Sequence, residues 1–233
     1  MKDADSNMQT SQRSALAGRI PWILLLSFGA IWVLLAVKPW YRQDWLLENV
    51  IVFLAIPVLV FLYRRAVLSP TSYLMVFVFL TLHEIGAHYT YSEVPYDAWW
   101  GAFTGFSLDA VMGWERNHFD RFLHLLFGLL ITYPMRELLI RTSGLKGVWS
   151  YALPVLLIMS MSTTYELIEW GAAMVFGGDL GMAYLGTQGD VWDTHKDMAC
   201  ASLGAIASML FVATVHFASR RRTTANGVVE RRR

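Results

Sequence analysis

Apolar residues gather in six long runs that alternate with short polar segments. The runs cover residues 20–37, 46–63, 71–88, 118–134, 149–176 and 191–217. A helix needs about 20 mostly apolar residues to cross the hydrocarbon of a bilayer. Because lipid offers the backbone no hydrogen-bond partners, each run is predicted to be helical. The pattern therefore predicts an all-α polytopic membrane bundle of six transmembrane helices. Residues 20–218 would form the membrane domain, between polar cytoplasmic tails at 1–19 and 219–233.

Composition supports this class and excludes others. The chain has 233 residues, of which 55% are hydrophobic and 16% charged, against about 25% charged in an average soluble domain. Its mean hydropathy is +0.41. These values exclude a disordered chain or a soluble nucleic-acid binder. The single cysteine, Cys200, excludes an intramolecular disulfide and a thiolate metal cluster.

Two segments need separate interpretation. The first run follows Arg13 and Arg19, as in a signal peptide, but Lys38-Pro39-Trp40 follows it in place of a small-residue cleavage pattern. We interpret it as a retained span. Residues 99–113 are aromatic and glycine-rich but too short to cross. They predict an interfacial or re-entrant segment. The longer aromatic stretch from Tyr89 to Trp114 is expected to cover a site and keep bulk water out.

Charge asymmetry predicts the orientation. If the N-terminus is cytoplasmic, the inner segments hold 14 of the 19 Lys and Arg residues and 4 of the 18 acids. The outer side then holds 14 acids and 5 basic residues. Because Lys and Arg accumulate on the cytoplasmic side, both termini are predicted to be cytoplasmic.

Ionisable residues recur inside four of the six runs and on the approach to the last of them. Each costs at least ~2.5–3.5 kcal/mol at the centre of a bilayer, which requires a reason. At about 1.5 Å of rise per residue, all four sets fall in the outer half of the membrane. The residues are His83, Glu84, His88, His118, Asp120, Arg121, His124, Glu166, Glu169, Asp190, Asp193, His195, Lys196 and Asp197.

Their spacing predicts pairs on single helix faces, because residues three or four apart lie side by side. Helix bundles build metal sites from such carboxylate and histidine pairs. We expect a divalent cation, zinc, manganese or iron, since the candidate ligands are oxygen and imidazole without thiolate. The candidate metal ligands are Glu84, His88, His124, Glu166, Glu169, Asp193 and Asp197. Asp120 and Arg121 are the candidate catalytic residues, and Arg121 would engage an anionic headgroup or orient Asp120.

Four blocks of these residues resemble the YjdF-like family of bacterial inner-membrane proteins. They are His83-Glu84-x-x-x-His88, Asn117-His118-Phe119-Asp120-Arg121-Phe122-x-His124, Tyr165-Glu166-x-x-Glu169-Trp170 and Gly186-Thr187-Gln188-Gly189-Asp190-x-x-Asp193-x-x-x-Asp197. The resemblance implies a multi-pass location in the inner membrane, but no reaction, because the family's domain has no known function. A fainter pattern, Asp120-Arg121-x-x-His124 followed by late acidic pairs, is similar to VanZ-like membrane proteins.

Three functions remain open from the sequence. The first is a metal-dependent hydrolase or transferase that acts on a lipid or lipid-linked substrate, with membrane lipids and no nucleic acid as partners. The second is a cation or proton-coupled transporter, since carboxylate and histidine chains also relay protons. The third is a non-enzymatic accessory membrane protein, in which the acids pair with Arg121 or Lys196 and hold helices in register. Zinc-protease chemistry is not indicated, because His83-Glu84-x-x-x-His88 has one residue too many for that motif.

Overall fold

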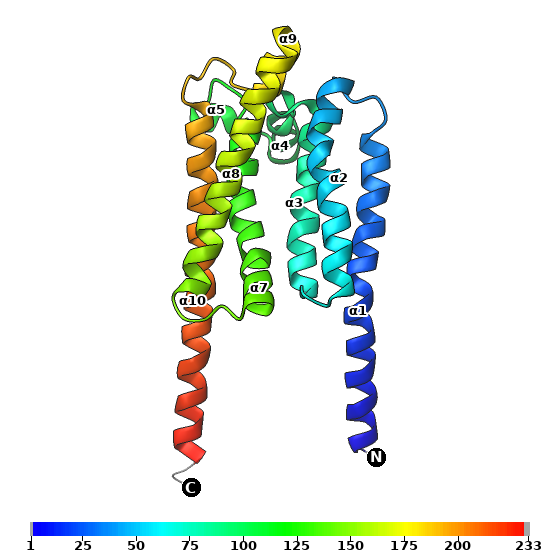
Figure 1. Cartoon of the computed structure of the whole chain (residues 1–233), viewed down its shortest axis with the longest axis vertical. Coiled ribbons are helices and arrows are strands. Elements are labelled where there is room, and N and C mark those ends of the chain that lie inside the picture. The colour runs from blue at the N-terminus through cyan, green and yellow to red at the C-terminus, as the bar shows by residue number, and fades with distance from the viewer. Residues whose placement is uncertain (1, 231–233) are drawn as a thin grey trace.

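The computed structural model describes the backbone of residues 2–230 and the side chains of residues 18–178, 181–182 and 184–220. Every regular element in this part of the chain is helical. The long helices run side by side, and the two ends of the chain lie at the same end of the bundle, the lower one in Figure 1.

The bundle has two halves. One consists of α1 (Lys2–Leu35), α2 (Arg42–Arg64) and α3 (Pro70–Tyr89), and the other is built from α6 (Phe119–Leu126), α7 (Thr132–Ser143), α8 (Trp149–Phe176) and α10 (Asp193–Glu230). A π-helical turn, η2 (Phe127–Ile131), joins α6 to α7 into one continuous rod. The expected fourth run thus extends to residue 143, and α1 and α10 continue into the predicted tails at 1–19 and 219–233. The basic side chains of residues 221–233 lie outside the described side chains.

Five of the described helical segments are long and apolar enough to cross a membrane. They are Gly18–Leu35, Arg42–Arg64, Phe119–Ser143, Trp149–Phe176 and Asp193–Arg220. The third predicted span corresponds to α3, which runs beside α1 and α2 (Figure 1) but is not among the five. Its ends are polar, with Thr71 and Ser72 at one and Glu84 near the other. Large apolar side chains on the other helices point outward, among them Leu26 and Phe211, which are 72% and 71% exposed. Such a surface suits lipid rather than water.

Each half is packed differently. Phe28, Val52 and Leu80 form a small apolar core among α1, α2 and α3. In the other half the backbones of η2 and α10 touch at two glycines. A Cβ atom on Gly128 would lie 2.0 Å from the carbonyl oxygen of Ala201, and one on Gly204 would lie 2.2 Å from that of Leu125. Small residues permit this close approach of helices, which brings the start of α6 next to the start of α10.

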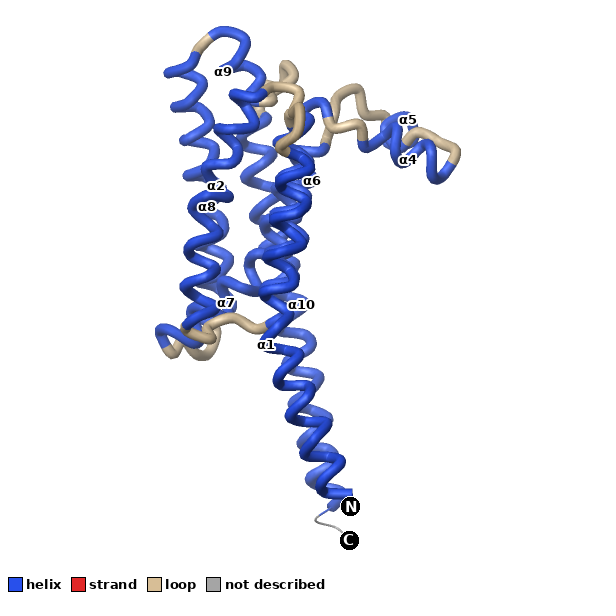
Figure 2. Tube along the Cα trace, turned by 90° about the vertical axis from the view of Figure 1, so that its right-hand side faces the viewer, coloured by secondary structure: helices blue, strands red, loops and turns tan. Residues whose placement is uncertain are grey.

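Short elements connect the helices at the upper end of the bundle. These are η1 (Tyr91–Glu93), α4 (Tyr96–Thr104), α5 (Leu108–Met112) and α9 (Gly178–Leu185). Helices α4 and α5 project sideways from that end (Figure 2). The aromatic segment predicted at 99–113 therefore forms a hairpin beside the bundle and does not pass down between the long helices.

Candidate functional site

Helices α6 and α10 both begin at the upper end of the bundle, so their N-terminal turns lie together. Asp120 and Asp193 occupy these first turns, where the helix dipole favours negative charge. His124 follows Asp120 by four residues and Asp197 follows Asp193 by four, which places each pair on one helix face. The predicted i, i+4 spacing thus brings side chains of two helices together.

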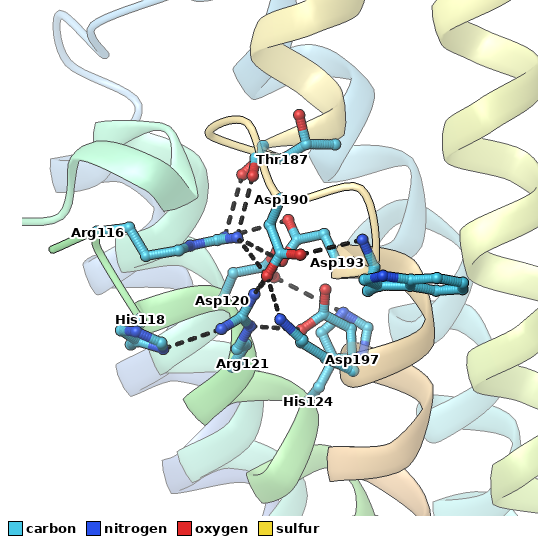
Figure 3. Close-up of polar contacts among 12 residues, drawn as sticks. Arg116, His118, Asp120, Arg121, His124, Thr187, Asp190, Asp193 and Asp197 are labelled. Atoms are coloured by element: carbon cyan, nitrogen blue, oxygen red, sulfur yellow. Dashed lines mark hydrogen bonds and ion pairs between the residues drawn. The ribbon is translucent and has the colours of Figure 1, made fainter. Parts of the chain in front are cut away.

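Asp120, His124 and Asp197 converge into one cluster, the Asp–His–Asp cluster (Figure 3). One ligand atom from each of the three lies within 4.8 Å of the other two. Nε2 of His124 is 3.6 Å from Oδ1 of Asp120 and 3.4 Å from Oε1 of Glu166, which α8 contributes. Asp197, Glu166 and His124 are buried. Oδ1 of Asp197 and Oε1 of Glu166 have no hydrogen-bond partner among the described residues, so the cluster has acceptor atoms to spare.

A network of basic side chains, the arginine network, lies against this cluster. Arg116 donates to both carboxylate oxygens of Asp193, at 2.6 and 3.1 Å. Arg121 donates to Asp193 at 2.7 Å and to Asp190 at 2.5 Å, and Lys196 donates to Asp190 at 2.5 Å. Asp193 is therefore neutralised by two arginines, which leaves its oxygens less available to a cation than those of the Asp–His–Asp cluster.

The arginine network also shapes the loop that precedes α10. Arg116 Nη1 donates to the carbonyl oxygen of Thr187 at 3.0 Å. The Lys196 ammonium and the Trp192 N–H, which both donate to Asp190, hold the pKa of that carboxyl below its ordinary value. Burial lowers the pKa of His118, and Arg121 beside it lowers it further. Nδ1 of His118 lies 3.5 Å from Nη1 of Arg121.

Further buried acids continue the polar layer toward α2 and α3. The Tyr165 hydroxyl on α8 donates to Oε2 of Glu48 on α2 at 2.9 Å. Glu169 follows Glu166 by one turn of α8 and is also buried. Glu84 on α3 is fully buried. Its carboxylate faces Asn49 and Trp45 of α2, and neither oxygen has a regular hydrogen bond within the described part of the chain.

The seven predicted ligands thus separate into groups. Three of them, His124, Glu166 and Asp197, meet around the Asp–His–Asp cluster. Asp193 belongs to the arginine network. His88 lies apart, with Nδ1 2.7 Å from the carbonyl oxygen of Leu35 at the end of α1. Of the two predicted catalytic residues, Asp120 belongs to the Asp–His–Asp cluster and Arg121 to the arginine network, with Nε 4.0 Å from Asp197.

Two participants were missed from the sequence. Arg116 lies in the loop between α5 and α6, outside the apolar runs, so the hydrophobic pattern does not point to it. The signal that could have identified Arg116 is its positive charge, because it is one of only five basic residues on the acid-rich side. Glu48 lies on α2, in the second predicted span, and is buried and bonded to Tyr165. Its own helix gives no signal of that, since the partner lies 117 residues away.

Comparisons with known proteins give a family and one relative. The family described as "Predicted membrane protein (DUF2238)" matches residues 20–218. The inner membrane protein YjdF of Escherichia coli strain K12 is 35% identical over 182 residues, which are 78% of this chain and 83% of that protein. No solved structure matches the chain.

Proposed function

Starting from the fact that this chain belongs to the DUF2238 family of predicted membrane proteins, as its YjdF-like motifs predicted, we propose that it spans the bacterial inner membrane six times. The similar Escherichia coli protein carries an inner-membrane name, which supports that location. Helix α3, 20 residues long, runs beside α1 and α2 and would be the sixth span. Both ends of the chain lie at one end of the bundle (Figure 1), and the excess of Lys and Arg there supports a cytoplasmic location for both.

Cysteine labelling in intact cells tests this topology. In a Cys200→Ser background, Glu93→Cys at the upper end should react with a membrane-impermeant maleimide. Lys146→Cys, in the loop between α7 and α8, should react only after the cells are broken. Both positions are exposed, so the membrane and not burial decides the outcome. Labelling of Lys146→Cys in intact cells would contradict the orientation.

The biochemical function that the geometry supports best is a divalent-cation site that serves a hydrolase or transferase. The observation that carries it is the convergence of Asp120, His124 and Asp197 within 4.8 Å, from the first turns of two helices. Glu166 would be the fourth ligand. Oxygen and imidazole ligands suit zinc, manganese or iron. A cation held there would polarise a substrate oxygen or activate a water molecule as a nucleophile.

The surroundings favour an anionic lipid or lipid-linked substrate. Arg116, Arg121 and Lys196 lie beside the proposed cation, at the end of the bundle that would meet the outer leaflet. Guanidinium groups bind phosphate with two parallel hydrogen bonds. A phosphate would compete with Asp190 and Asp193 for these basic groups. The arginine network would thus bind the substrate phosphate next to the proposed cation.

Elemental analysis of protein in lipid nanodiscs tests the site. After incubation with zinc, manganese or iron(II) and removal of free metal, the wild type should retain about one equivalent, as one site of this kind predicts. His124→Ala and Asp197→Asn should lose it. Glu137→Gln, which removes an acid on α7 that bonds Ser72 at the other end of the bundle, should retain it. A wild type without stoichiometric metal would overturn the proposal.

A transporter is the second candidate, because the buried acids continue from the Asp–His–Asp cluster to Glu48 and Glu84. Such chains handle protons or cations in carriers. Flux in proteoliposomes that is lost in Glu166→Gln would favour it. An accessory protein remains the third possibility, and it predicts that such variants change only stability.

A further inference from the structure

The hairpin of α4 and α5, the α4–α5 arm, projects sideways from the bundle (Figure 2). It exposes a dense set of apolar side chains. Phe103 is 90% exposed and Val111 67%. Trp99, Trp100, Phe106 and Met112 are also exposed. Between residues 98 and 113 the only charged residue is Asp109. Monomeric soluble proteins rarely expose such an apolar patch to water, and large exposed patches mark sites of interaction with proteins or membranes.

Polar groups of the arm form hydrogen bonds with one another. Asp97 accepts from the Asp109 N–H at 3.0 Å and from the Ser107 hydroxyl at 2.8 Å. The Tyr96 hydroxyl donates to Asp109 at 2.7 Å. Ser107 in turn caps α5 by accepting from the Ala110 N–H. The arm is therefore a built hairpin that turns its polar groups inward and its apolar ones outward.

An aromatic chain connects the arm to the outer ends of the spans. The ring of Tyr89, at the end of α3, lies 5.5 Å from that of Trp40 and 5.6 Å from that of Trp99. Tyr and Trp gather where hydrocarbon meets headgroups, because their rings are apolar and their polar atoms remain hydrated. Trp99 thus extends an interfacial belt from the bundle onto the arm.

We propose that the α4–α5 arm lies in the outer leaflet, at the boundary of headgroups and acyl chains, and inserts its aromatic side chains among lipids. Short helices with this character lie in the plane of an interface, and the arm leaves the bundle sideways, as that plane requires (Figure 2). Lipid is favoured over a protein partner for two reasons. The exposed apolar residues occur on both helices of the arm and on the turn between them, and they continue the aromatic belt.

The base of the arm is fastened to the candidate site. The N–H of His118 donates to the Tyr96 hydroxyl at 3.1 Å, and the side-chain amide of Asn117 donates to the Val94 carbonyl at 2.8 Å. Asn117 and His118 lie three and two residues before Asp120. An arm held at the headgroup level would therefore hold the Asp–His–Asp cluster at a fixed depth beneath the headgroups. This consequence rests on the proposed function, whereas the lipid contact does not.

Fluorescence quenching in nanodiscs tests the lipid contact. In the Cys200→Ser background, Phe103→Cys carries an environment-sensitive fluorophore, and the nanodiscs contain phosphatidylglycerol and phosphatidylethanolamine with a nitroxide near the headgroup or near the chain end. Most of the emission should be lost to the headgroup-proximal nitroxide and little to aqueous iodide. Val111→Cys repeats the measurement in case one variant fails to fold.

Two labelled positions calibrate the result. Leu210→Cys, 63% exposed on α10, should respond to lipid quenchers, and Glu115→Cys, in the loop after α5, should respond to iodide. If iodide quenches the arm positions as it quenches Glu115→Cys, the arm lies in water, free or as the site of a protein partner, and the proposal is overturned. The metal content of the same samples is measured in parallel. A failed cation site appears as absent metal, and a failed lipid contact appears as iodide quenching.

Discussion

The hydroxyl of Tyr165 donates a hydrogen bond to the carboxylate of Glu48 across 2.9 Å, although 117 residues separate the two in the chain. Tyr165 belongs to α8 and Glu48 to α2, so the bond joins the two halves of the bundle. Glu48 is only 3% exposed, and water cannot replace the donor that Tyr165 supplies. The upper end of the bundle is therefore held together by a polar contact as well as by apolar packing.

Tyr165→Phe should lower the free energy of unfolding by about 1–3 kcal/mol, the cost of leaving a buried acceptor without its donor. Reversible unfolding in mixed micelles measures it. Tyr151→Phe is the matched control, because its hydroxyl bonds His216 in an exposed position, and its effect should be smaller. Equal losses of unfolding free energy in the two variants would show that the buried bond to Glu48 contributes no more to stability than the exposed one.

Asp193→Asn and Asp197→Asn should behave differently although the two residues lie four apart on α10. Asp197→Asn removes a ligand of the Asp–His–Asp cluster and should abolish cation retention. Asp193→Asn weakens the hold on Arg116 and Arg121 and should leave retention intact. Elemental analysis of both variants, with circular dichroism to confirm folding, decides the point. Loss of the cation in Asp193→Asn alone would make Asp193 a ligand, as its spacing first suggested.

The pair of Arg116 and Asp193 should couple more strongly than an exposed ion pair. Its partners are 13% and 3% exposed and share two hydrogen bonds, so a double-mutant cycle with Arg116→Gln and Asp193→Asn should give about 1.5–3 kcal/mol. The reference pair is Arg141 and Glu137 on α7, where the arginine is 47% exposed. Its cycle should give about 0.3–0.5 kcal/mol. Similar values for both pairs would contradict the role of burial.

Gly128→Ala and Gly204→Ala should each destabilise the protein by about 1–3 kcal/mol, the usual cost of overpacking. The added methyl group would meet backbone of the facing helix, which cannot rotate away as a side chain can. Gly171→Ala in α8 is the control, because a methyl group there meets none of the described residues within 4 Å. Thermal unfolding measures all three, and a neutral Gly128→Ala would show that the two helices can separate without cost.

Sequence patterning predicted the long helices because lipid demands long apolar runs and tolerates few exceptions. It also predicted that acids and histidines of separate helices share one level, since depth follows from counting residues. It could not predict which side chains meet at that level. Glu84 and His88 lie four apart on α3, yet one faces Trp45 and the other the Leu35 carbonyl, because their partners come from different helices.

The division of α10 into two roles shows the same limit. Asp193 and Asp197 share one helix face, and their spacing alone makes them equivalent. What separates them is Arg116, which lies in the loop between α5 and α6 and bonds Asp193. Helical periodicity carries no information on that loop, so the arginine network could be recognised only in three dimensions.

The π-helical turn of residues 127–131 lies directly below the candidate site. A wide turn takes up one residue more than an α-helical turn, and such bulges often occur at functional sites. Removing a single residue there would restore regular winding and rotate everything above it by about 100° relative to α7. His124 would then face away from Asp197, while the number of apolar residues in the helix α6–η2–α7 would hardly change. The number of residues in this one turn thus sets the direction of the His124 side chain. Apart from Gly128, whose backbone touches α10, positions in 127–131 should tolerate substitutions far better than insertions or deletions.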